Sequence, residues 1–115
     1  MSFAITQEAF LDRSKTVTRR IGWLFLKPGD VLNGCVKCMG LKPGEKIVNL
    51  GQIRVRHMRR ESLRDLIDHP KYGQAEAIRE GFPHLTGEQF VKMFVKHMKG
   101  DKNQTVTRIE FEHVD

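Results

Sequence analysis

The 115-residue chain predicts an α+β fold, a small and mostly antiparallel β-barrel or sheet with flanking helices. Two patterns lead to this prediction. Apolar and polar residues alternate, as in strands, toward both ends and in a long central stretch, whereas helical spacing of apolar residues dominates 62–98. The length suits a single domain over residues 1–115, because two separate units would each bury too little apolar surface.

The first third of the chain predicts a short helix followed by two strands. Thr6 is the expected N-cap of a helix over 7–13. Residues 16–20 form a predicted strand, since β-branched residues alternate there with long polar ones. A Lys-Pro-Gly-Asp turn at 27–30 then leads into a second strand over 31–39.

The rest of the chain predicts a long strand, a helical middle and a closing strand. The long strand begins near Ile47, carries an irregularity at Gly51 and pairs as a hairpin with the strand before it. Three helical stretches are expected at 62–68, 74–79 and 86–98. A strand over 105–111 closes the domain, with Val106, Arg108 and Glu110 on one face and Thr107, Ile109 and Phe111 on the other.

The charge balance indicates a polyanionic partner, because the net charge is +6 and the isoelectric point is about 9.6. We therefore expect RNA or DNA. The positive charge is concentrated within eleven residues, in which Glu61 is the single acid, and the cluster comprises Arg54, Arg56, Arg59, Arg60 and Arg64. An ordinary half-buried strand explains the same residues, since arginines alternate there with Ile53 and Val55.

Several function classes receive no support from the sequence. No apolar run is long enough to cross a bilayer, and the start lacks the basic and apolar regions of a secretion signal, so we expect a cytoplasmic protein with no membrane role. Cys35 and Cys38 have the spacing of half a zinc or redox site, but no second cysteine pair completes it. We expect structural cysteines, no metal and no cofactor. The oligomeric state is left open.

The segment Lys15-Thr16-Val17-Thr18-Arg19-Arg20 is the strongest site candidate. It brings one amine, two hydroxyls and two guanidiniums together beside an apolar stretch. Three of these side chains are cationic, so the matching ligand is anionic or rich in acceptors. An exposed edge strand is the competing interpretation, in which the threonines are present for their β-propensity.

Four segments together resemble the ASCH domain family. They are Phe10-Leu11 with the Lys15–Arg20 motif, Pro28-Gly29-Asp30, Arg79-Glu80-Gly81-Phe82, and Val106–Phe111. The resemblance covers nearly the whole chain. It implies a PUA-like β-barrel with flanking helices, a positively charged groove and a role with RNA. Some small bacterial members are acetylcytidine amidohydrolases, and others have been linked to RNA cleavage.

The resemblance to the amidohydrolase members implies that Lys15, Thr18 and Glu80 are catalytic. A threonine hydroxyl needs a base, and a lysine becomes one only if burial or nearby positive charge lowers its pKa from about 10.4. Arg19 and Arg20 would supply positive charge and bind the ligand, whereas a close Glu80 carboxylate favours the ammonium form. The sequence does not decide which influence prevails.

The triad also requires an irregular start to the first strand. In a straight strand, Lys15 and Thr18 would point to opposite faces, so Lys15 must lie in the preceding turn or beside a bulge. Arg13 stands where the family often has glycine. If that turn needs a positive φ, a non-glycine residue there costs about 1–2 kcal/mol.

Three functions remain open at this level. The first is an amidohydrolase acting on an acylated pyrimidine nucleoside, and the second is a non-catalytic RNA-binding module. A ribonuclease is the third, although no pair of histidines at a telling spacing supports it. Trp23 either stacks on a base in the groove or packs into the core with Phe25, and we favour the core.

Overall fold

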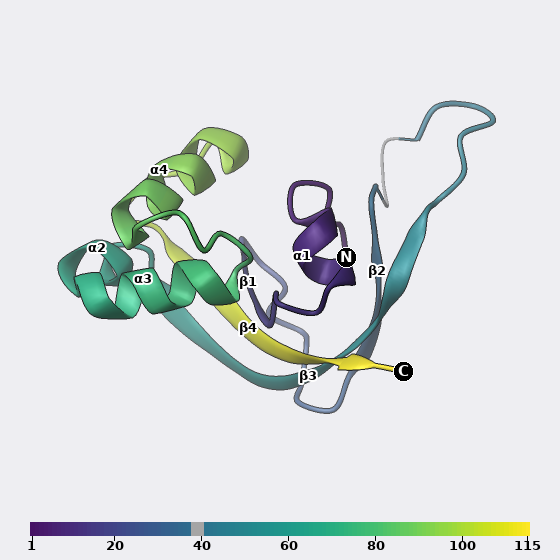
Figure 1. Cartoon of the computed structure of the whole chain (residues 1–115), viewed down its shortest axis with the longest axis horizontal. Helices are drawn as coiled ribbons and strands as arrows, with labels where there is room; N and C mark the ends of the chain where they lie inside the picture. Colours follow the sequence, from purple (N-terminus) through teal and green to yellow (C-terminus); the bar gives the residue numbers. More distant parts are fainter. Residues whose placement is uncertain (38–40) are drawn as a thin grey trace.

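The computed structural model describes residues 1–37 and 41–115, and its four antiparallel strands curl into a half-barrel flanked by helices (Figure 1). The strands are β1 (Val17–Arg20), β2 (Val31–Cys35), β3 (Asn49–Ser62) and β4 (Thr105–Val114). Their order across the sheet is β1-β4-β3-β2, which makes β1 and β2 the edges. The predicted α+β fold is confirmed.

The helices lie on two sides of this curled sheet. They are α1 (Gln7–Leu11), α2 (Asp65–Asp68), α3 (Pro70–Arg79) and α4 (Gly87–Met98). Figure 1 shows α2, α3 and α4 together at one end, while α1 lies above the curve of the sheet. No helix in the described parts of the chain is long and apolar enough to span a bilayer.

The long strand β3 bends because its pairing register shifts. Its first part pairs with β2, confirming the predicted hairpin, and most of its length pairs with β4. One shift falls between Val55 and His57, where an extra residue increases the local bend and twist. A second shift lies between Gly34 and Cys35, close to the predicted irregularity at Gly51, whose φ is +140°.

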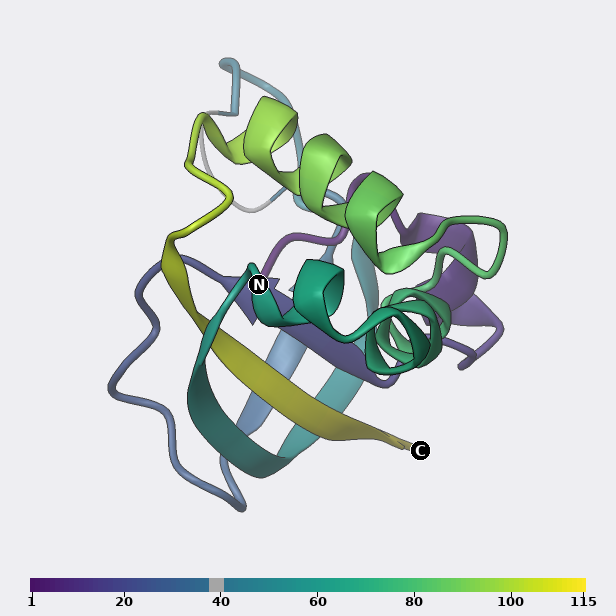
Figure 2. The same ribbon diagram turned by 90° about the vertical axis from the view of Figure 1, so that its left-hand side faces the viewer.

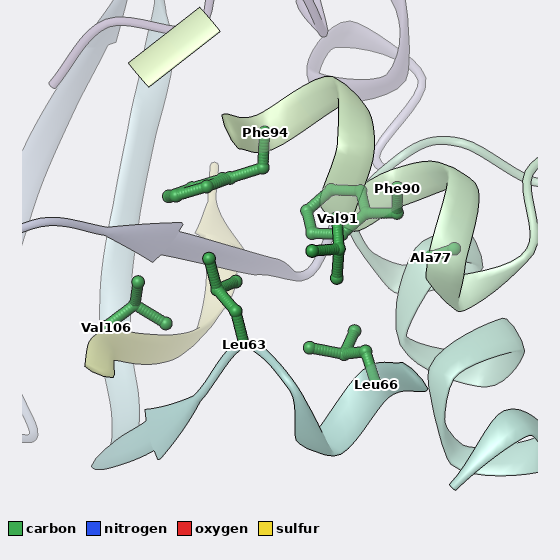
Figure 3. Packing of buried hydrophobic residues seen from close by; sticks show 7 residues of the cluster. All are labelled: Leu63, Leu66, Ala77, Phe90, Val91, Phe94 and Val106. Carbon is green, nitrogen blue, oxygen red and sulfur yellow. The ribbon is translucent and has the colours of Figure 1, made fainter. Parts of the chain in front are cut away.

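Strand β4 contributes to three apolar clusters, one on one face of the sheet and two on the other, as its alternation predicts. Val106 packs under the helices with the cluster of Figure 3, which comprises Leu63, Leu66, Ala77, Phe90, Val91 and Phe94. Ile109 and Phe111 face the interior of the half-barrel, where they join two further clusters that include Leu26, Val55, Phe3, Phe10 and Ile53. The core is therefore divided by the sheet.

Helix α4 confirms the helix predicted over 86–98. Thr86 Oγ1 accepts a hydrogen bond from the backbone N–H of Gln89 at 3.1 Å, and the Gln89 side chain accepts the Thr86 N–H at 2.9 Å. This reciprocal capping box satisfies two N–H groups that have no partner inside the helix. The helix buries Phe90 and Phe94, as the three- and four-residue spacing indicates.

Other predicted boundaries are wrong in informative ways. Strand β3 runs through Ser62, which pairs with Thr105, so α2 begins only at Asp65. Helix α3 begins at Pro70 rather than at residue 74, because proline is well suited to the first turn of a helix. Thr6 stands at the start of α1 but makes no capping hydrogen bond through its side chain. The predicted end of strand 31–39, at 38–39, lies outside the described residues.

The N-terminal segment bridges the two edges of the half-barrel. Ser2 forms a parallel bridge with Cys35 of β2, and the Phe3 N–H donates to the Cys35 carbonyl at 2.8 Å. From the opposite edge, Arg20 of β1 donates to the Ser2 carbonyl at 2.5 Å. The N-terminal segment therefore lies alongside β1, the strand that carries most of the motif singled out in the sequence.

Candidate functional site

Lys15 lies in the turn between α1 and β1, as the geometry of the motif requires. Arg13 in this turn has a φ of +67°, the left-handed conformation that glycine adopts more easily. The Lys15 N–H donates to the Ala9 carbonyl at 3.0 Å, and the Thr16 N–H donates to the Arg79 carbonyl at 2.9 Å. These bonds fix the turn against α1 and α3, and only 3% of the Lys15 side chain is exposed.

Glu80 receives the buried lysine. Lys15 Nζ donates to Glu80 Oε1 at 2.9 Å and to the Glu80 carbonyl oxygen at 2.6 Å. Glu80 is the C-cap of α3, and the chain turns away at Gly81, where φ is +99°. A Cβ at Gly81 would lie 2.7 Å from the Ala9 Cβ, so glycine lets the end of α3 approach α1 and Lys15.

Burial decides the direction in which the Lys15 pKa moves. Loss of water around the amine lowers the pKa below its ordinary value, and this outweighs the opposing effect of the Glu80 carboxylate. The positive charges of Arg20 and Arg19 act in the same direction as burial. The Lys15 ammonium therefore loses its proton more easily than that of an exposed lysine.

Thr18 is buried on β1 and is held by Arg20. The Arg20 Nε–H donates to Thr18 Oγ1 at 3.1 Å, and the guanidinium carbon lies 5.0 Å from the centre of the Phe3 ring. Among the hydrogen bonds of the described residues, none joins Thr18 to Lys15. Both residues instead line one cavity, so the structure brings the three proposed catalytic residues together around a shared space.

The cavity has a volume of about 230 Å³, and its lining contains both polar and apolar side chains. The residues of the motif that line it are Lys15, Thr18, Arg19 and Arg20, and Glu80 joins them. The lining from Phe82 and α4 is mainly apolar and comprises Phe82, Phe90, Met93, Phe94 and Met98, with His97 among them. A lining of this composition suits a ligand that has both an apolar surface and polar groups.

Arg19 is placed differently from its neighbour in the motif. Its side chain is fully buried on the helix-facing side of β1, where it contacts three carboxylates. Nε donates to Glu61 at 2.8 Å, Nη2 donates to Glu76 at 2.6 Å and Nη1 donates to Glu80 at 3.1 Å. Arg19 thus orients Glu80, while its donors are directed at protein carboxylates.

Glu76 is the centre of this buried network. It binds Arg19 and also accepts from Arg108 on β4, whose Nη2 lies 3.2 Å from Oε2. Hydrogen bonds from these guanidiniums, together with their positive charge, lower the Glu76 pKa to about 2 despite its burial. Tyr72 closes the network through its hydroxyl, which donates to Glu61.

Tyr72 and Glu76 were not singled out in the sequence, although a signal for them exists. Tyr72, Glu76 and Glu80 recur at four-residue steps, so they share one face of α3. That face meets Arg19 and Arg108, which lie opposite each other on β1 and β4. Beginning the helix at residue 74 excluded Tyr72 and concealed the stripe.

The arginines of β3 are exposed but largely engaged with neighbours. Arg54 and Arg56 both reach Glu112, at 3.0 and 3.3 Å. Arg59 contacts Glu61 and the Tyr72 hydroxyl. Arg60 donates to Thr107 Oγ1 at 2.7 Å and makes no ion pair among the described residues.

Trp23 lies outside this cavity, in the loop after β1. It is half-buried against the cluster of Leu26, Val55 and Ile109, and its ring centre is 5.5 Å from that of Phe25. Phe25 itself is 71% exposed, so the pair has one side on the core and the other in solvent. Trp23 therefore packs against the core, as favoured from the sequence, although its partner Phe25 is exposed, and it does not line the cavity.

The comparisons with known proteins bear on the fold. The fold of this chain matches that of a DUF984 protein. That protein, from Enterococcus faecalis V583, has a crystal structure that aligns with a TM-score of 0.62 over 96% of this chain and 71% of its own length. The two sequences are 14% identical, so the likeness establishes shared architecture alone. No family model matches the sequence, and no curated protein matches it either.

Proposed function

We propose that this protein is an amidohydrolase that removes the acyl group from an N-acylated cytidine such as acetylcytidine. The carrying observation is the buried Lys15 amine, held by Glu80 in a cavity that Thr18 also lines. The substrate class comes from the resemblance of the Lys15–Arg20 and Glu80 segments to the amidohydrolases of the ASCH family. The DUF984 likeness supports the architecture only.

In the proposed reaction, Lys15 is the base and Thr18 is the nucleophile. A neutral amine has two N–H groups, and donating both to Glu80 leaves its lone pair to accept a proton. The Arg20 Nε–H already donates to Thr18 Oγ1, so the threonine is free to give its own hydroxyl proton to the base. Arg20 also stabilises negative charge that develops on this oxygen.

The steps balance without a cofactor. Thr18 Oγ1 attacks the acyl carbon while Lys15 takes the hydroxyl proton. The carbon–nitrogen bond then breaks, and the ammonium of Lys15 returns the proton to the leaving exocyclic amine, giving cytidine and an acyl-threonine ester. Water, deprotonated by Lys15, hydrolyses the ester and releases the carboxylic acid and free Thr18.

Turnover of acetylcytidine by purified variants tests this proposal. Lys15→Met and Thr18→Val should each lower kcat/KM by about 10²–10⁴-fold, the range expected when a base or its nucleophile is removed. Lys71→Met, at an exposed position on α3, is the matched control and should retain the activity. Thermal unfolding of each variant identifies losses that come from misfolding. Equal rates in the wild type and Lys15→Met would rule out the mechanism.

A non-catalytic RNA-binding module is the second candidate, supported by the net charge of +6 and by the exposed Arg56 and Arg60. It predicts RNA binding that weakens with salt and falls when these two arginines are changed to glutamine. Acetylcytidine would remain intact in its presence. RNA binding that is absent, or that does not depend on salt, would contradict this candidate.

A further inference from the structure

Several lysines that have no ion pair among the described residues lie on α4 and in the loop that follows it. On β3, Glu112 is shared by Arg54 and Arg56, and Glu61 contacts Arg59. On and after α4, the described residues provide no ion pair for Lys96, Lys99 or Lys102. Lys92 has only a distant partner, Glu88, at 3.9 Å.

These lysines border a groove that is separate from the site described above. The groove runs between α4, the start of α2 and the loop at 100–103. Its cationic lining residues are Arg64, Lys92, Lys96 and Lys102, against the acids Glu88 and Asp101. Four positive and two negative charges leave a net charge of +2 there, before Lys99 at the end of the helix is added.

Helix α4 forms a wall between the groove and the cavity. Phe90, Phe94 and His97 line the cavity, whereas Lys92 and Lys96 line the groove. At 100° per residue these sets lie on opposite sides of the helix. The two sites are therefore separated by about one helix diameter of 10–12 Å.

The end of α4 keeps a lysine where backbone geometry favours glycine. Lys99 is the C-cap and has a φ of +52°, a left-handed conformation in which glycine is strain-free. Glycine occupies the next position, Gly100, and not the position with the left-handed conformation. A cation here also interacts favourably with the helix dipole, but Lys96 and His97 already serve the last turn.

We propose that this groove binds the phosphodiester backbone of single-stranded RNA, and that Lys92, Lys96, Lys99 and Lys102 contact its phosphates. The three lysines of the helix recur about once per turn, so they present a row of cations to a chain of regularly spaced anions. Charge complementarity favours this partner. The inference goes beyond the proposed function and depends on it only where turnover is measured.

Binding of a short, unmodified oligouridylate tests the proposal independently of catalysis. Lys96→Gln/Lys102→Gln should reduce the slope of log affinity against log salt by about 1.4, since each lost contact with a single strand removes about 0.7. At 0.1 M salt this corresponds to about 25-fold weaker binding than the wild type, if the two affinities converge near 1 M. Lys96→Arg/Lys102→Arg keeps the charges and should retain binding.

The control is a charge-matched change on β3. Arg54→Gln/Arg56→Gln also lowers the net charge from +6 to +4, yet it removes arginines that already share Glu112, so binding should change little. An equal loss in both double variants, or no loss in Lys96→Gln/Lys102→Gln, would overturn the proposal. Binding to vesicles containing phosphatidylserine without binding to the oligouridylate would overturn it in favour of a membrane surface.

Turnover distinguishes this inference from the proposed function. Lys96→Gln/Lys102→Gln should hydrolyse free acetylcytidine at the wild-type rate but show a raised KM for an oligonucleotide that contains acetylcytidine. If no variant and no wild-type sample hydrolyses either substrate, the proposed function fails, whereas the binding measurement still decides the fate of the groove. Unchanged KM for the oligonucleotide contradicts the groove alone.

Discussion

At the scale of single residues, Lys15 shows how one side chain can be buried, charged and still poised for chemistry. Burial penalises the ammonium form, and Glu80 compensates with one carboxylate and one carbonyl oxygen. The result is a pKa below the ordinary value rather than above it. If the amine is the base, kcat should therefore rise with pH and level off below the range in which exposed lysines titrate.

The turn that orients Lys15 requires a left-handed backbone conformation at Arg13, and this requirement can be tested. Its φ of +67° is strained for any residue with a Cβ, whereas its side chain contributes only an exposed pair with Asp115. Arg13→Gly should therefore be more stable than Arg13→Ala by about 1 kcal/mol, since both lose the pair and only glycine relieves the strain. Urea unfolding of the two variants measures this difference.

The comparison has an internal check at Lys15. Because the turn fixes the direction of the lysine, Arg13→Gly should preserve its environment and any turnover that the protein has. Alanine at least as stable as glycine would show that the turn does not require a left-handed conformation.

At the scale of elements, α3 shows what sequence patterns could and could not predict. Its existence followed from composition, and the use of Lys15 and Glu80 followed from the resemblance. The face that carries Tyr72 and Glu76 did not follow, because these residues matter through contacts with Arg19 and Arg108 on strands distant in sequence. Periodicity describes one element at a time, so pairings between elements remain hidden.

The contact of α3 with its neighbours depends on two facing glycines. A Cβ at Gly73 would lie 2.0 Å from the Leu66 carbonyl oxygen and 3.0 Å from the Gly87 Cα. Gly73→Ala should therefore separate α3 from α2 and α4 and destabilise the protein by about 1–3 kcal/mol or more, as overpacking does. Gln74→Ala, exposed on the same helix, should change the free energy of unfolding by less than about 0.5 kcal/mol.

Chemical unfolding and the NMR resonances of the α4 residues that line the cavity check the Gly73 prediction. Because α4 supplies Phe90 and Phe94 to that lining, a displaced helix should perturb their NMR resonances as well as stability. A Gly73→Ala protein as stable as Gln74→Ala would mean that the helices are not packed as closely as described.

At the scale of the whole molecule, the buried carboxylates link folding to pH. Glu76 has a pKa of about 2 in the folded protein, whereas an unfolded glutamate has one near 4.3. Between these values the unfolded chain binds more protons, so the stabilisation is complete above about pH 4.3 and is lost as pH falls toward 2. The Glu61 pKa is also lowered, by Arg19, which acts in the same direction.

Unfolding free energies measured across this acidic range test the linkage. The wild type should lose stability steeply below about pH 4.3, and Glu112→Gln, at an exposed partner of Arg54, should follow the same curve. Carboxyl NMR titration of the folded protein measures the pKa of Glu76 directly. A Glu76 carboxylate that titrates at its ordinary value would contradict the network.

The whole fold was more predictable than the assembly of its site. Strand alternation at 16–20 and 105–111 and the helical spacing of Phe90 and Phe94 indicated the α+β class, because each pattern is local. The bends of β3 and the contact between β1 and the N-terminal segment depend on how the strands are arranged after pairing. Sequence alone therefore located the motif, while tertiary contacts determine which of its residues share the cavity.

The buried ion network has an implication for how this chain can diverge. Its three buried cations, Lys15, Arg19 and Arg108, are matched by three buried acids, Glu61, Glu76 and Glu80. Breaking a buried ion pair by removing one partner costs about 3–5 kcal/mol, whereas replacing a whole set by apolar residues is often tolerated. In descendants and redesigned versions of this fold, we expect these six positions to be kept or exchanged together, as covarying groups.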